Sequence, residues 1–238
     1  MSKRVKKRFT SDVKIIDFQP YLPQKKHRVS LYPRNSNQRK YLEKLQDEQK
    51  SIVFAIGPAG TGKTMLAVQY GIKLFQEGVI DKIVVTRPAV SVDEDLGFLP
   101  GTLNEKMAPW TRPIFDVFEE YYSQKEVATM LDEGVIEISP LAYMRGRTFK
   151  NAYIVADEMQ NATQNQMKML LTRLGESSKM VVTGDLAQAD RVEDNGLITF
   201  CNLITNKVEL KHIDLVRFDA CDIERHEAVK EILKIYGD

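Results

Sequence analysis

GPAGTGKT, at residues 57–64, joins a wholly apolar run to a helical pattern. It fits G-x-x-x-x-G-K-S/T at every fixed position. Its glycines let backbone N–H groups turn inward around phosphate oxygens, and the following helix adds the positive end of its dipole. In this pattern Lys63 reaches the β and γ phosphates, and Thr64 offers its hydroxyl to Mg²⁺. A glycine-rich turn before a helix is the alternative, but the strand-loop-helix placement favours a phosphate-binding loop. We expect the loop to be lined by Gly57, Pro58, Ala59, Gly60, Thr61, Gly62, Lys63 and Thr64.

Short apolar runs alternate with amphipathic helical patterns along residues 37–238. The expected strands are residues 52–56, 82–86, 135–138, 153–156, 180–183 and 213–218. The first expected helix has Asn37 as its N-cap. Further helices are expected at residues 63–78, 110–131, 163–174, 197–203 and 222–235. This alternation predicts one α/β domain at residues 37–238, with a mostly parallel sheet covered by helices on both faces.

The charge is distributed unevenly along the chain. Residues 1–40 hold twelve lysines and arginines against two acidic residues, and the remainder holds 22 basic and 31 acidic residues. Residues 1–36, with scattered prolines and no sustained period, are expected to form a basic N-terminal arm. Four aromatic residues lie among or near its charges: Phe9, Phe18, Tyr21 and Tyr32. The arm therefore suits contact with a polyanion or, alternatively, is a solvated tail that folds against the acidic body.

Cysteine content and hydropathy indicate the compartment. Two cysteines, Cys201 and Cys221, are too few and too far apart for a disulfide framework or a zinc site. The first residues contain no apolar run long enough for a signal peptide or a membrane span. These features predict a soluble cytoplasmic protein without a membrane partner.

An acidic pair follows the apolar run at residues 153–156. Because ligands of parallel α/β sheets bind at the carboxyl ends of strands, Asp157 is placed to hold Mg²⁺, and Glu158 to deprotonate an attacking water. Such a pair is commonly a solvated turn or an N-cap, but the upstream phosphate-binding loop favours the catalytic reading. A further segment, residues 183–188 (TGDLAQ), ends another apolar run at the same edge. Its Gln188 suits a neutral sensor of the γ-phosphate, and an Asx-type turn is the alternative.

GPAGTGKT, VADEMQN at residues 155–161 and TGDLAQAD at residues 183–190 together resemble motifs I, II and III of superfamily 1 helicases. With TRPAV at residues 86–90, LAYMRGRTF at residues 141–149 and DIERH at residues 222–226, the chain resembles the PhoH family from about Asn37 onward. Met159 departs from the small residue that relatives often carry, but its neighbours keep the chemistry of the motif.

The resemblance implies a RecA-like core that hydrolyses ATP with Mg²⁺, acts on single-stranded RNA and is associated with phosphate starvation in bacteria and phages. A phage-encoded protein would work in the host cytoplasm. By the same resemblance Gln38 contacts adenine, and Arg87 lies on the face that holds single-stranded nucleic acid. We find no appended PIN nuclease or KH domain, so the ribonuclease activity of longer relatives is not expected.

Superfamily 1 motors close two lobes on ATP, and residues 37–238 amount to one. We expect a homo-oligomer, a hexameric ring, in which each subunit sends an arginine into the neighbouring site. The first candidate for this catalytic arginine is Arg225 on the expected closing helix, followed by Arg145 and Arg147. A solvated helix residue paired with nearby acids is the alternative for Arg225.

Arg87, Arg145 and Arg147 are also candidates for lining an RNA channel. Contacts of this kind go mainly to phosphates, so they give salt-dependent binding with little sequence preference. The expected activity is thus ATP hydrolysis coupled to RNA binding or remodelling. One alternative is a nucleotide-gated RNA-binding module that does not act as a motor. The other is a P-loop kinase. The segments DEMQN and GDLAQ argue against a kinase, because they suit water as the acceptor of the phosphoryl group.

Overall fold

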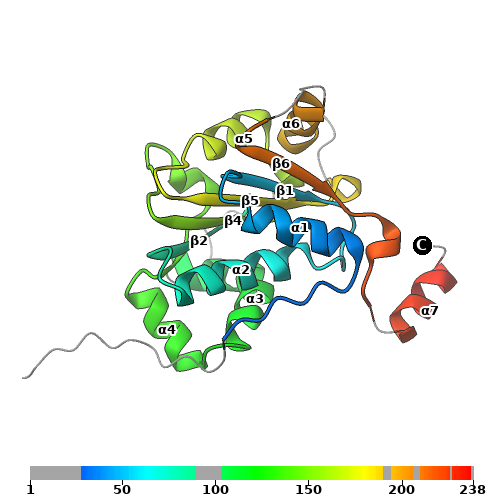
Figure 1. Cartoon of the computed structure of the whole chain (residues 1–238), viewed down its shortest axis with the longest axis horizontal. Coiled ribbons are helices and arrows are strands. Elements are labelled where there is room, and N and C mark those ends of the chain that lie inside the picture. Colours follow the sequence, from blue (N-terminus) through cyan, green and yellow to red (C-terminus); the bar gives the residue numbers. More distant parts are fainter. Residues whose placement is uncertain (1–27, 89–102, 190–193, 206–209, 226, 237–238) are drawn as a thin grey trace, which may run out of the picture.

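A single parallel sheet forms the centre of the chain (Figure 1). The computed structural model describes residues 28–88, 103–189, 194–205, 210–225 and 227–236. Six strands lie in the order β3-β2-β4-β5-β1-β6, and each neighbouring pair is parallel. They are β1 (Ile52–Ile56), β2 (Lys82–Thr86), β3 (Ile136–Ile138), β4 (Ala152–Ala156), β5 (Lys179–Gly184) and β6 (Ile213–Arg217).

The strand order decides where the site lies. The register aligns Ile56 with Gly184 and Thr86 with Ala156, so the carboxyl ends of the central strands meet at one edge of the sheet. One strand, β5, separates β1, which precedes the phosphate-binding loop, from β4, which precedes Asp157. The predicted α/β fold with a mostly parallel sheet is confirmed.

Helices cover both faces of the sheet (Figure 1). One face carries α1 (Ser36–Gln46), α2 (Lys63–Gln76), α3 (Leu103–Glu119) and α4 (Gln124–Asp132), whose buried side chains share one core cluster. The other carries α5 (Gln164–Leu171) and α6 (Gly196–Thr205), which share a second cluster. The short 3-10 helices are η1 (Leu141–Met144), η2 (Met159–Asn161), η3 (Leu186–Gln188) and η4 (Ala220–Asp222). The last helix, α7 (Glu227–Tyr236), stands away from the sheet.

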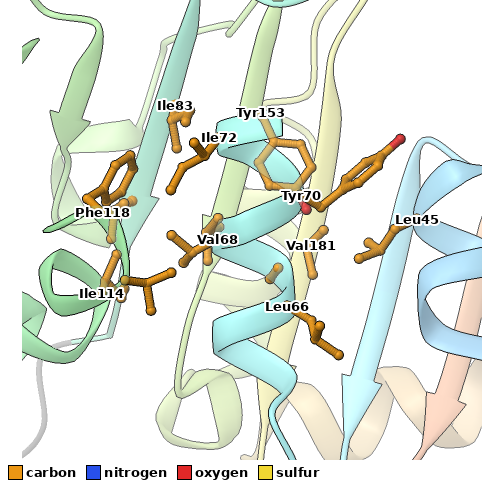
Figure 2. Close-up of a cluster of buried hydrophobic side chains, with 14 of the residues drawn as sticks. Leu45, Leu66, Val68, Tyr70, Ile72, Ile83, Ile114, Phe118, Tyr153 and Val181 are labelled. Carbon is orange, nitrogen blue, oxygen red and sulfur yellow. The ribbon is translucent and has the colours of Figure 1, made fainter. Parts of the chain in front are cut away.

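Helix α2 is the element that connects the core to the phosphate-binding loop. Its apolar residues pack against residues of β2, β4 and β5, including Ile83, Tyr153 and Val181 (Figure 2). At Gly71 the helix comes so close to the sheet that an added Cβ would lie 2.6 Å from Cδ1 of Tyr153. The missing side chain therefore lets α2 lie close against β4.

Several expected boundaries differ from those observed. The N-cap of α1 is Asn35 rather than Asn37, since the Asn35 side chain accepts a hydrogen bond from the backbone N–H of Gln38. The helix expected at residues 110–131 is two helices, because Ser123 begins α4 with a capping box. The helix expected at residues 163–174 ends at Leu171. The closing helix expected from residue 222 begins at Glu227.

The predicted basic arm falls largely on residues 1–27, which lie outside the described residues together with Phe9, Phe18 and Tyr21. From residue 28 onward the chain runs along the body, where Val29 is buried and its N–H donates to Oε1 of Gln76 at 3.1 Å. Tyr32 is exposed. Within the described ranges, none of the helices has the length and apolar character needed to span a bilayer.

Candidate nucleotide-binding site

A cleft of about 240 Å³ lies where the carboxyl ends of β1, β4 and β5 meet. It brings together three segments that are far apart in the sequence: the phosphate-binding loop, the acidic pair after β4 and the turn after β5. The cleft is lined by Ala59, Gly60, Gly62, Lys63, Thr64, Met65, Asp157, Glu158, Thr183, Gly184, Asp185 and Gln188. The strand-end placement predicted for Lys63, Asp157, Glu158 and Gln188 is therefore what the structure has.

Lys63 directs its ammonium group back into the phosphate-binding loop. Its Nζ donates to the carbonyl oxygens of Gly57 and Pro58, each at 2.6 Å, and lies 3.3 Å from Oγ1 of Thr61. Burial lowers the pKa of Lys63, and the nearby carboxylates, Asp185 first among them, act in the opposite direction. The loop thus concentrates a partly desolvated positive charge at the first turn of α2, where backbone N–H groups also point outward.

Asp157 is the buried carboxylate of the cleft. Its Oδ1 accepts from Oγ1 of Thr64 at 2.7 Å and from Oγ1 of Thr183 at 2.5 Å. The set of oxygen donors formed by Asp157 and Thr64 fits Mg²⁺, a hard cation that prefers carboxylate and hydroxyl ligands. The sequence reading missed Thr183 as a partner of Asp157. Its place at the end of an apolar run was the available signal.

Glu158 adopts a left-handed backbone conformation, with φ +53°. Residues other than glycine adopt this region rarely, and such outliers gather at functional sites. The Glu158 carboxylate accepts a short hydrogen bond from Nε2 of Gln160, whose Oε1 in turn accepts from the N–H of Asp185 at 3.2 Å. Gln160 therefore joins the segments after β4 and β5 and orients the proposed base.

Gln188 lies at the edge of the cleft at the end of η3. The Asx-type turn that was the alternative reading is also present, because Oδ1 of Asp185 accepts from the N–H of Ala187 at 3.0 Å. The two readings are compatible: the Asp185 turn positions the residue that faces the cleft. A role for Gln188 as a γ-phosphate sensor stays a prediction.

Gln38 braces the phosphate-binding loop from α1. Its side chain is 1% exposed, its Nε2 donates to the carbonyl of Thr61 at 3.0 Å, and its Oε1 accepts from the N–H of Arg34 at 2.8 Å. Both ends of the amide are thus bonded within the protein. The implied adenine contact stays a prediction, and the contact that the structure has is with the loop itself.

The structure corrects the expected position of Arg225. It precedes α7 in an irregular segment rather than lying on a helix. The backbone N–H of Glu224 donates to the carbonyl of Gly60 at 3.0 Å, and a Cβ added at Gly60 would lie 2.7 Å from Nε of Arg225. The side chain therefore rests against the phosphate-binding loop of its own chain, whereas the sequence reading assigned it to a neighbour.

The three candidate nucleic-acid arginines differ in their surroundings. Arg87 follows β2 at the same edge of the sheet, and its Nη1 donates to the carbonyl of Trp110 at 3.2 Å. Arg147 pairs with Glu137 and lies over the ring of Phe149, 4.5 Å from its centroid. Arg145 is exposed. None of the three is among the residues that line the cleft, and a role for each of them in binding nucleic acid stays a prediction.

The arrangement offers backbone donors and an ammonium group for phosphates, oxygen ligands for a divalent cation and a carboxylate, Glu158, next to them. These are the elements that phosphoryl transfer requires, because its catalysis depends on positioning and charge neutralisation.

Comparison with known proteins agrees with these motifs. The model of the PhoH-like protein family matches residues 30–237. The PhoH-like protein of Bacillus subtilis is 43% identical over 210 residues, which cover 87% of this chain and 64% of the relative. Protein PhoH of Escherichia coli K12 is 40% identical over 214 residues, covering 86% of this chain and 57% of the relative. The chain thus spans less than two thirds of the length of these relatives.

Among solved structures, the SWI2/SNF2 ATPase core of Sulfolobus solfataricus in complex with dsDNA covers 73% of this chain and 36% of its own, with a TM-score of 0.43 and 14% identity. That similarity is too distant to indicate function. The family model and the curated relatives confirm the resemblance read from the motifs. The chain therefore belongs to the PhoH-like protein family.

Proposed function

We propose that this chain is a Mg²⁺-dependent ATPase whose hydrolysis is coupled to binding or remodelling single-stranded RNA. One observation carries the ATPase part: the Asp157 carboxylate bonds the hydroxyl of Thr64, the residue that ends the phosphate-binding loop, at 2.7 Å. This contact joins the phosphate-binding and metal-binding elements in one cleft. Lys63 neutralises the phosphates, Thr64 and Asp157 hold Mg²⁺, and Glu158 activates water.

Coupling to RNA is supported by the family membership and by charge. The basic residues near the N-terminus, together with Arg87 and the exposed Arg145, offer phosphate contacts. We propose that the protein works in the cytoplasm, the host cytoplasm for a phage protein, in the response to phosphate starvation. A homo-oligomeric ring, of six subunits, is the assembly that we propose.

The test compares wild type with Lys63→Ala and Glu158→Gln in ATP hydrolysis and ATP binding, with and without single-stranded RNA. Because a general base contributes about 10²–10⁴-fold, Glu158→Gln should lose at least about 100-fold in rate and still bind ATP. Lys63→Ala should lose binding as well. Normal binding and hydrolysis by Lys63→Ala would overturn the proposal.

The same assay separates the other functions. ATP-dependent RNA affinity without turnover would identify a nucleotide-gated RNA-binding module. Phosphate that appears on a metabolite instead of as free phosphate would identify a kinase. RNA-stimulated release of free phosphate that disappears in Glu158→Gln is the result that we expect.

A further inference from the structure

The segment between β6 and α7 contacts the phosphate-binding loop at Gly57 and Gly60. It begins with Phe218, whose N–H extends the pairing of β6 by donating to the carbonyl of Ile56 at 2.7 Å. It then reaches Gly60 twice, through the N–H of Glu224 and through the side chain of Arg225. Residues that follow the last strand of the sheet thus contact both the start of the loop, at Gly57, and its middle, at Gly60.

Asp222 holds this segment in place. It is 3% exposed, and its Oδ2 accepts from Nδ2 of Asn37 at 2.7 Å and from the N–H of Asp219 at 2.9 Å. Its backbone carbonyl also accepts from Nδ2 of Asn35, the N-cap of α1, at 3.3 Å. A buried carboxylate is tolerated only when it is well bonded, so the bonds with Asn37 and Asp219 are strong constraints.

The same helix braces the loop from a second direction, because Gln38 of α1 bonds the carbonyl of Thr61. Gly60 and Thr61 are therefore held between α1 and the segment 219–225. All these contacts lie within one chain. These contacts place Arg225 against the phosphate-binding loop of the same chain.

We propose that Arg225 binds the triphosphate in the site of its own chain, and that Asp222 is the residue that positions it. A guanidinium group forms paired, charge-assisted hydrogen bonds with phosphate oxygens. This one contacts the phosphate-binding loop at Gly60 and is not among the residues that line the cleft, so the proposal requires its side chain to turn toward the phosphates. The inference rests on the proposed ATPase function and names a further ligand-binding residue of that site. It replaces the expectation that Arg225 serves an adjacent subunit.

Binding of a fluorescent ATP analogue tests the first part. Because a hydrogen bond to a charged group contributes enough for about a tenfold change or more in affinity, Arg225→Ala should weaken binding by at least that factor. Arg39→Ala removes an exposed arginine of α1 and serves as the matched control. Inorganic tripolyphosphate, which lacks the nucleoside, should displace the analogue from wild type, and its affinity for the Arg225→Ala variant should be weaker by the same factor. Unchanged competition by tripolyphosphate would show that the arginine does not contact phosphate.

A mixing experiment separates the two directions of action. Lys63→Ala chains and Arg225→Ala chains are co-expressed with different tags and purified together through both tags. If Arg225 acts within its own chain, the mixture hydrolyses ATP no faster than the sum of its two variants. Activity well above that sum would mean that an intact Arg225 completes a neighbour's site, and this result would overturn the proposal.

A double-mutant cycle tests the positioning role of Asp222. Asp222→Ala removes the carboxylate oxygen that accepts from both Asn37 and Asp219. It should weaken ATP binding in wild type and have no further effect in Arg225→Ala. Equal effects in both backgrounds would reduce Asp222 to a structural role. If wild type itself fails to bind ATP, the proposed function fails. If wild type binds ATP and the Arg225 and Asp222 variants bind it equally well, only the present inference fails.

Discussion

We expect Thr183→Val to lower the free energy of unfolding by about 1.5–3 kcal/mol, the value of a hydrogen bond to a charged group. The Thr183 hydroxyl donates to Oδ1 of Asp157 at 2.5 Å, and the two residues are 1% and 6% exposed. Valine has nearly the same shape as threonine, so the change removes the donor without leaving a cavity. Both residues line the cleft, but their low exposure limits how far water can replace the lost bond.

Thermal and urea unfolding followed by circular dichroism measure the effect. For a chain of 150–250 residues, each kcal/mol shifts the midpoint by about 2–4 °C, so we expect a decrease of about 3–12 °C. Thr129→Val is the matched control, because the exposed Thr129 hydroxyl donates only to the backbone carbonyl of Lys125 at 3.0 Å. That variant should change stability by about 0.5 kcal/mol or less. If Thr183→Val is as stable as the control, the Asp157 carboxylate does not depend on this donor and the reasoning is refuted.

Two further predictions concern the body of the fold. Gly71→Ala should destabilise the chain by up to about 2 kcal/mol in urea unfolding, because overpacking against Tyr153 costs about 1–3 kcal/mol and the gain in helix propensity offsets about 1 kcal/mol. A raised midpoint would contradict the close approach of α2. Burial lowers the pKa of Lys179 from 10.5 to about 8. Between these pH values the unfolded chain holds more protons, so the free energy of unfolding should rise with pH. The Lys179→Met variant should lack this rise. If the free energy of unfolding has the same pH dependence at pH 7.5–10 in both proteins, the pKa of Lys179 is not lowered.

Much of the fold was predictable because the local signals were strong. β1 and β2 have the expected bounds, since each is a short apolar run that ends at a marked change in composition. The gap between α3 and α4 was missed, because the apolar period continues across it while Ser123 forms a capping box. The N-cap was placed on Asn37 although Asn35 makes the capping bond. Two nearby asparagines cannot be distinguished by residue type alone.

The candidate site divides in the same way. Its strand-end residues were predictable, because parallel strands bring their carboxyl ends to one edge whatever their order in the sheet. The contact of Asp222 with Asn37 was not predictable from the sequence, since it joins residues 185 positions apart. Without those contacts residues 222–225 resemble the start of a helix, and this explains the wrong position expected for Arg225. Whether the site binds and hydrolyses ATP stays a prediction.

The bonds that Lys63 makes inside its own loop determine which molecules can enter. A ligand can bind the ammonium group of Lys63 only if its oxygens compete with the carbonyl oxygens of Gly57 and Pro58. The bonds from the ammonium group to these neutral carbonyls are already charge-assisted, so an oxygen that is itself negatively charged should compete better than a hydroxyl of an uncharged sugar or nucleoside. We therefore expect the loop to select anionic ligands before any other part of the ligand is recognised.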